Sequence, residues 1–228
     1  MPPPIECRPE AFVFFAEQLR ELETTNGLFR AAIAIAMHAM PDVVPLEVER
    51  NVRRLTDRVR QRVRGNSRQA MLAHLHDELF ERQEFRGNVD DYFNPRNSFV
   101  PAVLDTGLGI PISLSLIYKV VATRLGLRVE GVNAPGHFMV LVATTGRPML
   151  VDPFFRGQML SREEAFARMD DAVGRRLPRT ERYLRPATHK QWIGRMLQNL
   201  VGVYSAQDEP DDVAAMSELA QLLGMPIF

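Results

Sequence analysis

Residues 94–157 read NPRNSFVPAVLDTGLGIPISLSLIYKVVATRLGLRVEGVNAPGHFMVLVATTGRPMLVDPFFRG, and this stretch decides the fold. A glycine–proline turn at 107–111 precedes an apolar run at 112–125, which predicts a helix because proline is favoured in the first helical turn. The run is apolar on every face, so we expect the helix to be buried. The residues that follow predict strands at 127–132, 138–142 and 149–151. The stretch therefore indicates an α+β fold in which a buried central helix packs on a small antiparallel sheet.

A histidine and an acid stand at corresponding ends of the predicted hairpin. His137 begins one strand and Asp152 ends the other, so the two side chains can face each other across paired strands. The acid would then hold the imidazole in one tautomer. Such a pair opposite a helix N-terminus is the layout of a Cys-His-Asp hydrolase or acyl transferase. The alternative is a buried histidine whose hydrogen bond to the acid is purely structural.

The nucleophile of such a site is missing from the helix entrance. Cys7 is the only cysteine, and it lies in a proline-rich lead-in far along the chain from the motif. Ser113 is the first choice among serines, provided that the helix begins later than expected. Ser115 is on the same helix face as Pro111 but about 6 Å deeper. For both serines, a hydrogen bond from the helical hydroxyl to a backbone carbonyl is the favoured interpretation.

Four segments carry a family resemblance: NPRNS at 94–98, LGIPISLSLIY at 108–118, RLGLRVEGVNAPGHF at 124–138 and VDPFFRG at 151–157. Through them the chain resembles the SirB-type branch of the transglutaminase-like superfamily, whose core is papain-like. The resemblance implies that a Gly-x-Cys motif begins the core helix in active relatives. Here Pro111 falls on the cysteine position, whereas His137 and Asp152 fall on the family's histidine and acid. The segment 195–204 resembles the start of a tetratricopeptide-like tail that is cut short.

The chain divides into three expected parts: a helical layer at 1–90, a transglutaminase-like core at 91–173 and a helical extension at 174–228. No Gly/Ser linker separates them, so we expect one compact unit. The first ninety residues show no strand signal, and Asn26-Gly27 predicts the end of the first helix.

An arginine-rich helix is expected over 45–64. Its arginines fill the faces that its apolar stripe leaves open: Arg50, Arg53, Arg54, Arg58, Arg60, Arg62 and Arg64. They form either a basic surface for an anionic partner or a solvated outer face. The solvated face is favoured, because charged outer faces are the norm for amphipathic helices.

The composition is that of a globular protein. The 228 residues carry a formal net charge of zero, which gives the whole molecule no reason to seek nucleic acid or a membrane. No run approaches the roughly 18 apolar residues of a membrane span, and the N-terminus lacks a signal-peptide pattern. One cysteine permits no intramolecular disulfide, which suits a cytoplasmic protein.

These observations favour a non-catalytic transglutaminase-like domain, a pseudoenzyme that binds a protein or peptide. Its cleft would be lined by Pro111, Asn97 and Asn133, although a turn is the favoured role of Asn97. The alternative is an amide or ester hydrolase or acyl transferase in which His137 and Asp152 serve a displaced nucleophile such as Ser113. Two ligands are too few for a specific zinc site, so no metal or cofactor is expected. The oligomeric state stays open.

Overall fold

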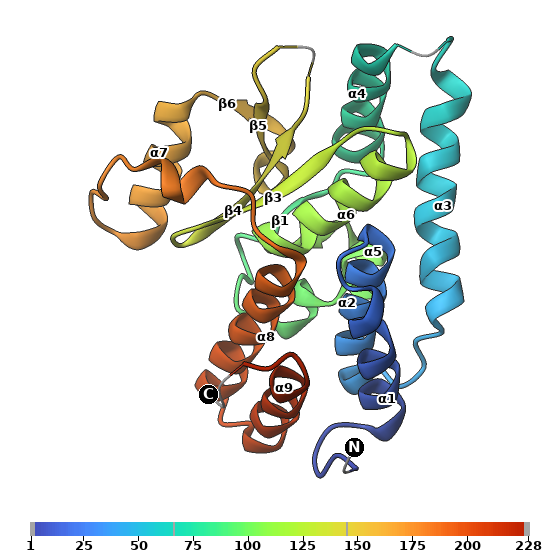
Figure 1. Cartoon of the computed structure of the whole chain (residues 1–228), viewed down its shortest axis with the longest axis vertical. Helices are drawn as coiled ribbons and strands as arrows, with labels where there is room; N and C mark the ends of the chain where they lie inside the picture. Colours follow the sequence, from blue (N-terminus) through green and yellow to red (C-terminus); the bar gives the residue numbers. More distant parts are fainter. Residues whose placement is uncertain (1–2, 66, 145, 226–228) are drawn as a thin grey trace.

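The computed structural model describes residues 3–65, 67–144 and 146–225. It is α+β, as the sequence predicts, with helices on both sides of a small sheet (Figure 1). The helices are α1 (Pro9–Gln18), α2 (Thr25–Ala39), α3 (Pro45–Arg62), α4 (Arg68–His76), α5 (Val100–Thr106), α6 (Pro111–Arg124), α7 (Arg162–Val173), α8 (His189–Ala206) and α9 (Pro210–Leu222). The strands are β1 (Arg86–Gly87), β2 (Leu108–Gly109), β3 (Val129–Ala134), β4 (His137–Val142), β5 (Met149–Asp152) and β6 (Gln158–Leu160).

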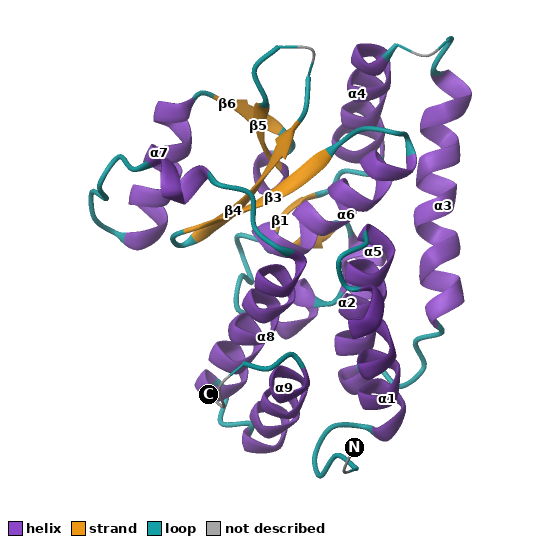
Figure 2. Cartoon of the chain, viewed as in Figure 1, coloured by secondary structure: helices purple, strands orange, loops and turns teal. Residues whose placement is uncertain are grey.

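The main sheet is antiparallel with the order β3-β4-β5-β6, and Figure 2 shows it between α7 and the remaining helices. In the β4–β5 pair, Val140 lies opposite Val151. In the β3–β4 pair, Ala134 lies opposite His137. A separate parallel pair joins β1 to β2 just before α6.

The two faces of the main sheet belong to different apolar clusters. Phe138 and Val140 belong to the cluster that also contains α6. Val132 and Met139 belong to a smaller cluster with residues of α7. Because successive side chains of a strand point to opposite faces, β4 separates α6 from α7. The central helix is buried along 111–122, as its apolar sequence predicts.

The larger apolar core draws on the N-terminal, central and C-terminal parts of the chain alike. It includes Phe29 of α2, Leu116 of α6, Trp192 of α8 and Leu219 of α9. Helix α2 contacts both α6 and α8. Removal of any one part would therefore expose apolar side chains of the other two.

Two expectations for the N-terminal part are wrong. Asn26-Gly27 does not end the first helix but lies in the first turn of α2, where the Thr24 hydroxyl accepts a hydrogen bond from Gly27 N–H at 2.9 Å. Glycine is needed there because a Cβ would lie 2.0 Å from the Glu21 carbonyl oxygen. The first ninety residues also contain strand β1, which is too short to show an alternating pattern.

None of the helices in the described ranges has both the length and the apolar character needed to cross a lipid bilayer.

Candidate functional site

The structure brings the predicted histidine and acid together. His137 Nε2 lies 2.8 Å from Asp152 Oδ2, and the two side chains are 7% and 0% exposed. His137 begins β4 and Asp152 ends β5, and because Val140 pairs with Val151 the two residues meet diagonally across the end of the hairpin. An ionised carboxylate can only accept, so Nε2 of His137 is the donor of this hydrogen bond.

Asp152 holds two further groups in place. Its Oδ1 accepts a hydrogen bond from Phe154 N–H at 3.1 Å, which begins the turn after β5. Arg168 of α7 places its Nε 3.7 Å from Asp152 Oδ2. The same guanidinium lies 3.7 Å from the centroid of the Phe155 ring, a cation–π geometry. The buried carboxylate of Asp152 therefore contacts the imidazole of His137, the turn that carries Phe154 and Phe155, and Arg168 of α7.

The entrance of α6 holds no reactive side chain at the position where the resemblance places a thiol. Pro111 occupies the first turn and is buried. The Ser113 hydroxyl lies 2.6 Å from Asn97 O and 3.0 Å from Ile110 O, and it accepts from Ile110 N–H at 3.2 Å. Within the described residues it makes no hydrogen bond to His137. Ser113 therefore secures the start of α6 through backbone contacts, as the favoured interpretation expects.

Ser115 departs from its expected role. Its Oγ is buried and has no hydrogen-bond partner in the part of the chain that the structure describes. The expected bond to a helical carbonyl is absent, so that prediction is wrong. Hydroxyl rotamers on a helix are set by the side chains packed around them, which the spacing of Ser115 does not reveal.

The two asparagines have different surroundings. Asn97 is buried, and its Nδ2 donates to Asp91 O at 2.6 Å and to Tyr92 O at 3.1 Å. These bonds tie a loop together, which agrees with the favoured turn role. Asn133 is exposed on β3, and its Oδ1 accepts from Arg195 Nη1 at 3.0 Å.

The only cysteine is an unsuitable nucleophile. Cys7 is buried, and burial, together with the nearby charge of Glu218, raises the pKa of its thiol to about 12. Its backbone N–H donates to Glu218 Oε2 at 3.0 Å, so the lead-in lies against α9. A thiol with such a pKa carries almost no thiolate at neutral pH.

Exposed aromatic side chains adjoin the histidine. The ring of the buried Phe154 has its centroid 6.1 Å from that of His137, 6.0 Å from Tyr92 and 5.1 Å from Phe155. Tyr92 also contacts Phe93. Exposure reaches 38% for Tyr92, 70% for Phe93 and 40% for Phe155. We call Tyr92, Phe93 and Phe155 the aromatic surface.

Phe154 also links the histidine to the entrance of α6. A Cβ on Gly87 would lie 2.4 Å from the Phe154 ring, so the ring packs directly on β1. Gly87 is paired with Gly109, two residues before Pro111. Sequence reasoning missed the aromatic surface, although the pair at 92–93 borders one recognised motif and the pair at 154–155 lies inside another. Exposure of a large aromatic side chain cannot be read from such pairs.

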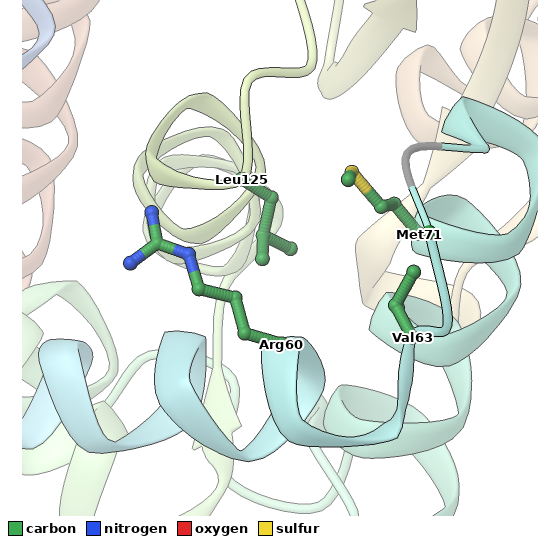
Figure 3. Close-up of a pocket in the computed structure, with 5 residues that line it drawn as sticks. Arg60, Val63, Met71 and Leu125 are labelled. Atoms are coloured by element: carbon green, nitrogen blue, oxygen red, sulfur yellow. The ribbon is translucent and has the colours of Figure 1, made fainter.

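Two arginines of α3 pair with acidic side chains while staying partly exposed to solvent. Arg58 Nε lies 2.6 Å from the buried Glu78 Oε1, and Arg62 pairs with Asp77 and Glu78. A pocket of about 250 Å³ lies beside it, near the end of α6 remote from Pro111 (Figure 3). It is lined by Arg60, Val63, Gly65, Met71 and Leu125. These ion pairs support the solvated-face interpretation.

Metal ligands do not gather anywhere in residues 3–65, 67–144 and 146–225. No three His, Cys, Asp or Glu side chains there are arranged to hold an ion.

Comparisons with known proteins give one family model and several relatives. The family model described as "Transglutaminase-like superfamily" matches residues 46–198. A UPF0162 protein of Xylella fastidiosa is 32% identical over 200 residues, which cover 86% of this chain and 71% of the relative. A UPF0162 protein of Pseudomonas aeruginosa is 29% identical with the same coverage. F-box only protein 21 of Mus musculus is 45% identical over 62 residues, or 27% of this chain and 10% of that protein. No solved structure is significantly similar to the chain.

Proposed function

The chain belongs to the transglutaminase-like superfamily, and on that premise we propose that it is a non-catalytic member, a pseudoenzyme that binds an extended segment of a protein or peptide beside His137. The observation that carries the proposal is the aromatic surface next to an intact His137–Asp152 pair that no thiol accompanies.

The missing nucleophile supports the non-catalytic part. Acyl transfer of this type needs a thiol or hydroxyl within hydrogen-bond reach of the base. Pro111 has neither, and the single proton of the Ser113 hydroxyl is directed to backbone carbonyls. A hydrolase that uses Ser113 would have to break these bonds before the hydroxyl could meet His137. We therefore rank the hydrolase or acyl transferase second.

The aromatic surface supports the binding part. Tyrosine and phenylalanine supply large contact areas at low cost in conformational entropy, and aromatic residues are enriched at binding hot spots. Phe155 is held between His137 and Arg168, and Tyr92 is held by Phe154. Their orientation is thus fixed before a partner arrives, which reduces the entropy lost on binding.

Within the superfamily we assign the chain to the SirB-type branch, on the four motifs given above. We further propose that α8 and α9, which pack against each other, are the beginning of a tetratricopeptide-like tail. A cytoplasmic location is our proposal as well, because the only cysteine is buried and unpaired with another.

Selection from a random heptapeptide library displayed on phage tests the binding proposal. We expect the immobilised protein to enrich peptides that bind Phe155→Ala and Phe93→Ala at least about tenfold more weakly, the usual loss at an aromatic hot spot. Phe93 is 70% exposed, so Phe93→Ala should unfold at the temperature of the wild type, and thermal unfolding checks that Phe155→Ala is folded. Leu46→Ala, which removes an exposed apolar side chain from α3, is the matched control.

The proposal is contradicted if the library yields no binder. It is equally contradicted if the selected peptides bind Phe155→Ala and Phe93→Ala as tightly as they bind the wild type.

A further inference from the structure

We propose that the bound segment adds to the free edge of β6 as an extra strand, so that its backbone exchanges hydrogen bonds with Met159 while an apolar side chain covers Phe155. This inference rests on the proposed function and specifies how the partner is recognised.

The main sheet has two edges, and the chain itself covers one of them. Strand β3 lies at one end of the order β3-β4-β5-β6 and β6 lies at the other (Figure 2). Pro186 forms a bridge with Val132 of β3, and Ala187 N–H donates to Gly131 O at 2.8 Å. No strand in the described part of the chain pairs with the outer side of β6. An uncovered edge is a template for pairing with another chain.

The register shows which backbone groups of β6 face outward. Ala134 and His137 close the two-residue turn between β3 and β4, so they exchange both hydrogen bonds. Successive residues of a strand bond alternately to its two neighbours, and Val140 therefore bonds to Val151 on β5. Met159 lies opposite Val151 on β6. Because the backbone of Val151 bonds to β4, the N–H and C=O of Met159 point away from β5.

Further observations agree with this assignment. The same alternation directs the C=O of Gly131 away from β4, and there it accepts the hydrogen bond from Ala187. Among the described residues, no hydrogen bond outside the ladders involves the N–H or C=O of Met159, and this residue is 62% exposed. Strand β6 thus offers one donor and one acceptor that an extended backbone can satisfy.

The aromatic surface adjoins this edge through Arg168. The guanidinium lies 3.7 Å from the centroid of the Phe155 ring, and its Nη2 donates to Gln158 Oε1 at 2.6 Å. Gln158 precedes Met159, so its side chain lies on the opposite face of β6. A segment that bonds to Met159 would place its next side chain on the face of Gln158, beside Phe155. That side chain should be apolar, because the exposed ring of Phe155 is the group that it would cover.

A peptide segment suits this edge better than a second copy of the chain. A stable dimer needs a contact of about 800 Å² on each partner, whereas β6 has only three residues. A flexible segment needs only to reach the strand and the neighbouring ring.

The first test uses the tightest heptapeptide from the phage library, resynthesised with a methyl group on one backbone nitrogen at a time. We expect methylation of one nitrogen to weaken binding to the wild type about tenfold, because the donor to Met159 O is lost. Methylation of either neighbouring nitrogen should change the affinity less than about twofold, since those N–H groups point away from β6.

Variants of Met159 test the other hydrogen bond. Met159→Pro removes the N–H, and proline is tolerated where the N–H of an edge strand faces solvent. Met159→Ala removes the same side chain but keeps the N–H, so it is the matched control. We expect the heptapeptide to bind Met159→Pro about tenfold more weakly than Met159→Ala. Thermal unfolding checks that both variants are folded, and the methylated peptides alone decide the outcome if Met159→Pro does not fold.

The possible failures separate the two proposals. If the library yields no binder, the proposed function fails and this inference fails with it. If the peptides bind through Phe155 and Phe93 but no single methylation weakens them, or neighbouring methylations weaken them equally, only strand addition at β6 is overturned. A dimer of the free wild type that Met159→Pro dissociates would also overturn it, because the edge would then hold a second copy.

Discussion

Replacement of Trp192 by alanine should lower the free energy of unfolding by about 3–5 kcal/mol, the usual cost of removing a buried tryptophan. Trp192 is fully buried on α8, and its ring centroid lies 4.6 Å from that of Phe138 on β4. It packs so closely on β3 that a Cβ at Gly131 would lie 2.2 Å from the indole. This loss is a large share of the total free energy of unfolding, which is about 5–15 kcal/mol for a typical domain. Urea unfolding followed by circular dichroism measures it.

Two further variants identify the contact that is lost. The indole Nε1 has no hydrogen-bond partner among the residues described, so Trp192→Phe loses packing but no hydrogen bond and should cost less than half as much as alanine. Gly131→Ala overpacks the same contact and should cost about 1–3 kcal/mol in the wild type. It should cost clearly less in Trp192→Ala, where the indole is gone and only the contact with Phe138 Cε1 at 2.9 Å stays. Additive costs of Gly131→Ala and Trp192→Ala would contradict the packing described.

Replacement of Asp152 by alanine should cost about 3–5 kcal/mol, because two buried donors lose their acceptor at roughly 1–3 kcal/mol each. It leaves His137 Nε2–H and Phe154 N–H without acceptors and removes the carboxylate near Arg168. Asp152→Asn should cost less, because an amide oxygen can still accept from Phe154 N–H. Chemical denaturation at neutral pH gives both values.

The imidazole provides the internal control for that prediction. If the cost arises from an orphaned donor, His137→Ala in the Asp152→Ala background should cost clearly less than His137→Ala alone. A loss below about 1 kcal/mol for Asp152→Ala, within the range of an exposed ion pair, would show that the pair does not hold the turn after β5.

The sequence predicts the central unit well because its signals are local. The apolar run at 138–142 and the turn at 144–148 predict the hairpin. Its register pairs Val140 with Val151, so His137 and Asp152 meet diagonally at the end of the hairpin and are not directly opposite each other. The apolar run after Pro111 predicts a buried helix for the same reason. Short elements are harder to predict from the sequence. Strands β1 and β6 have only two and three residues, which is too few to show an alternating pattern of apolar and polar side chains.

Other parts of the site depend on contacts between distant segments. Arg195 donates a hydrogen bond to Asn133, which is 62 residues away in the sequence. From the sequence alone, Arg195 is indistinguishable from any other polar residue of a helix. The end of the first helix was misplaced because Asn-Gly is a common helix terminator, whereas here Thr24 caps the next helix. Such outcomes follow from packing between helices, which no local pattern encodes.

The His137–Asp152 pair has a structural role that does not depend on chemistry. Asp152 connects His137, the Phe154–Phe155 turn and Arg168, and these groups hold Phe155 of the aromatic surface in place. The binding domain that we propose would need this framework to present the rings.

The central claim is that the pair no longer supports acyl transfer, and a turnover assay tests it most directly. Wild type and His137→Ala are incubated with a fluorescent amine donor and glutamine-containing peptides, and amide formation and peptide hydrolysis are followed by mass spectrometry. We predict equal product for the two proteins, at the level of the buffer alone. Turnover by the wild type that His137→Ala abolishes would contradict the account.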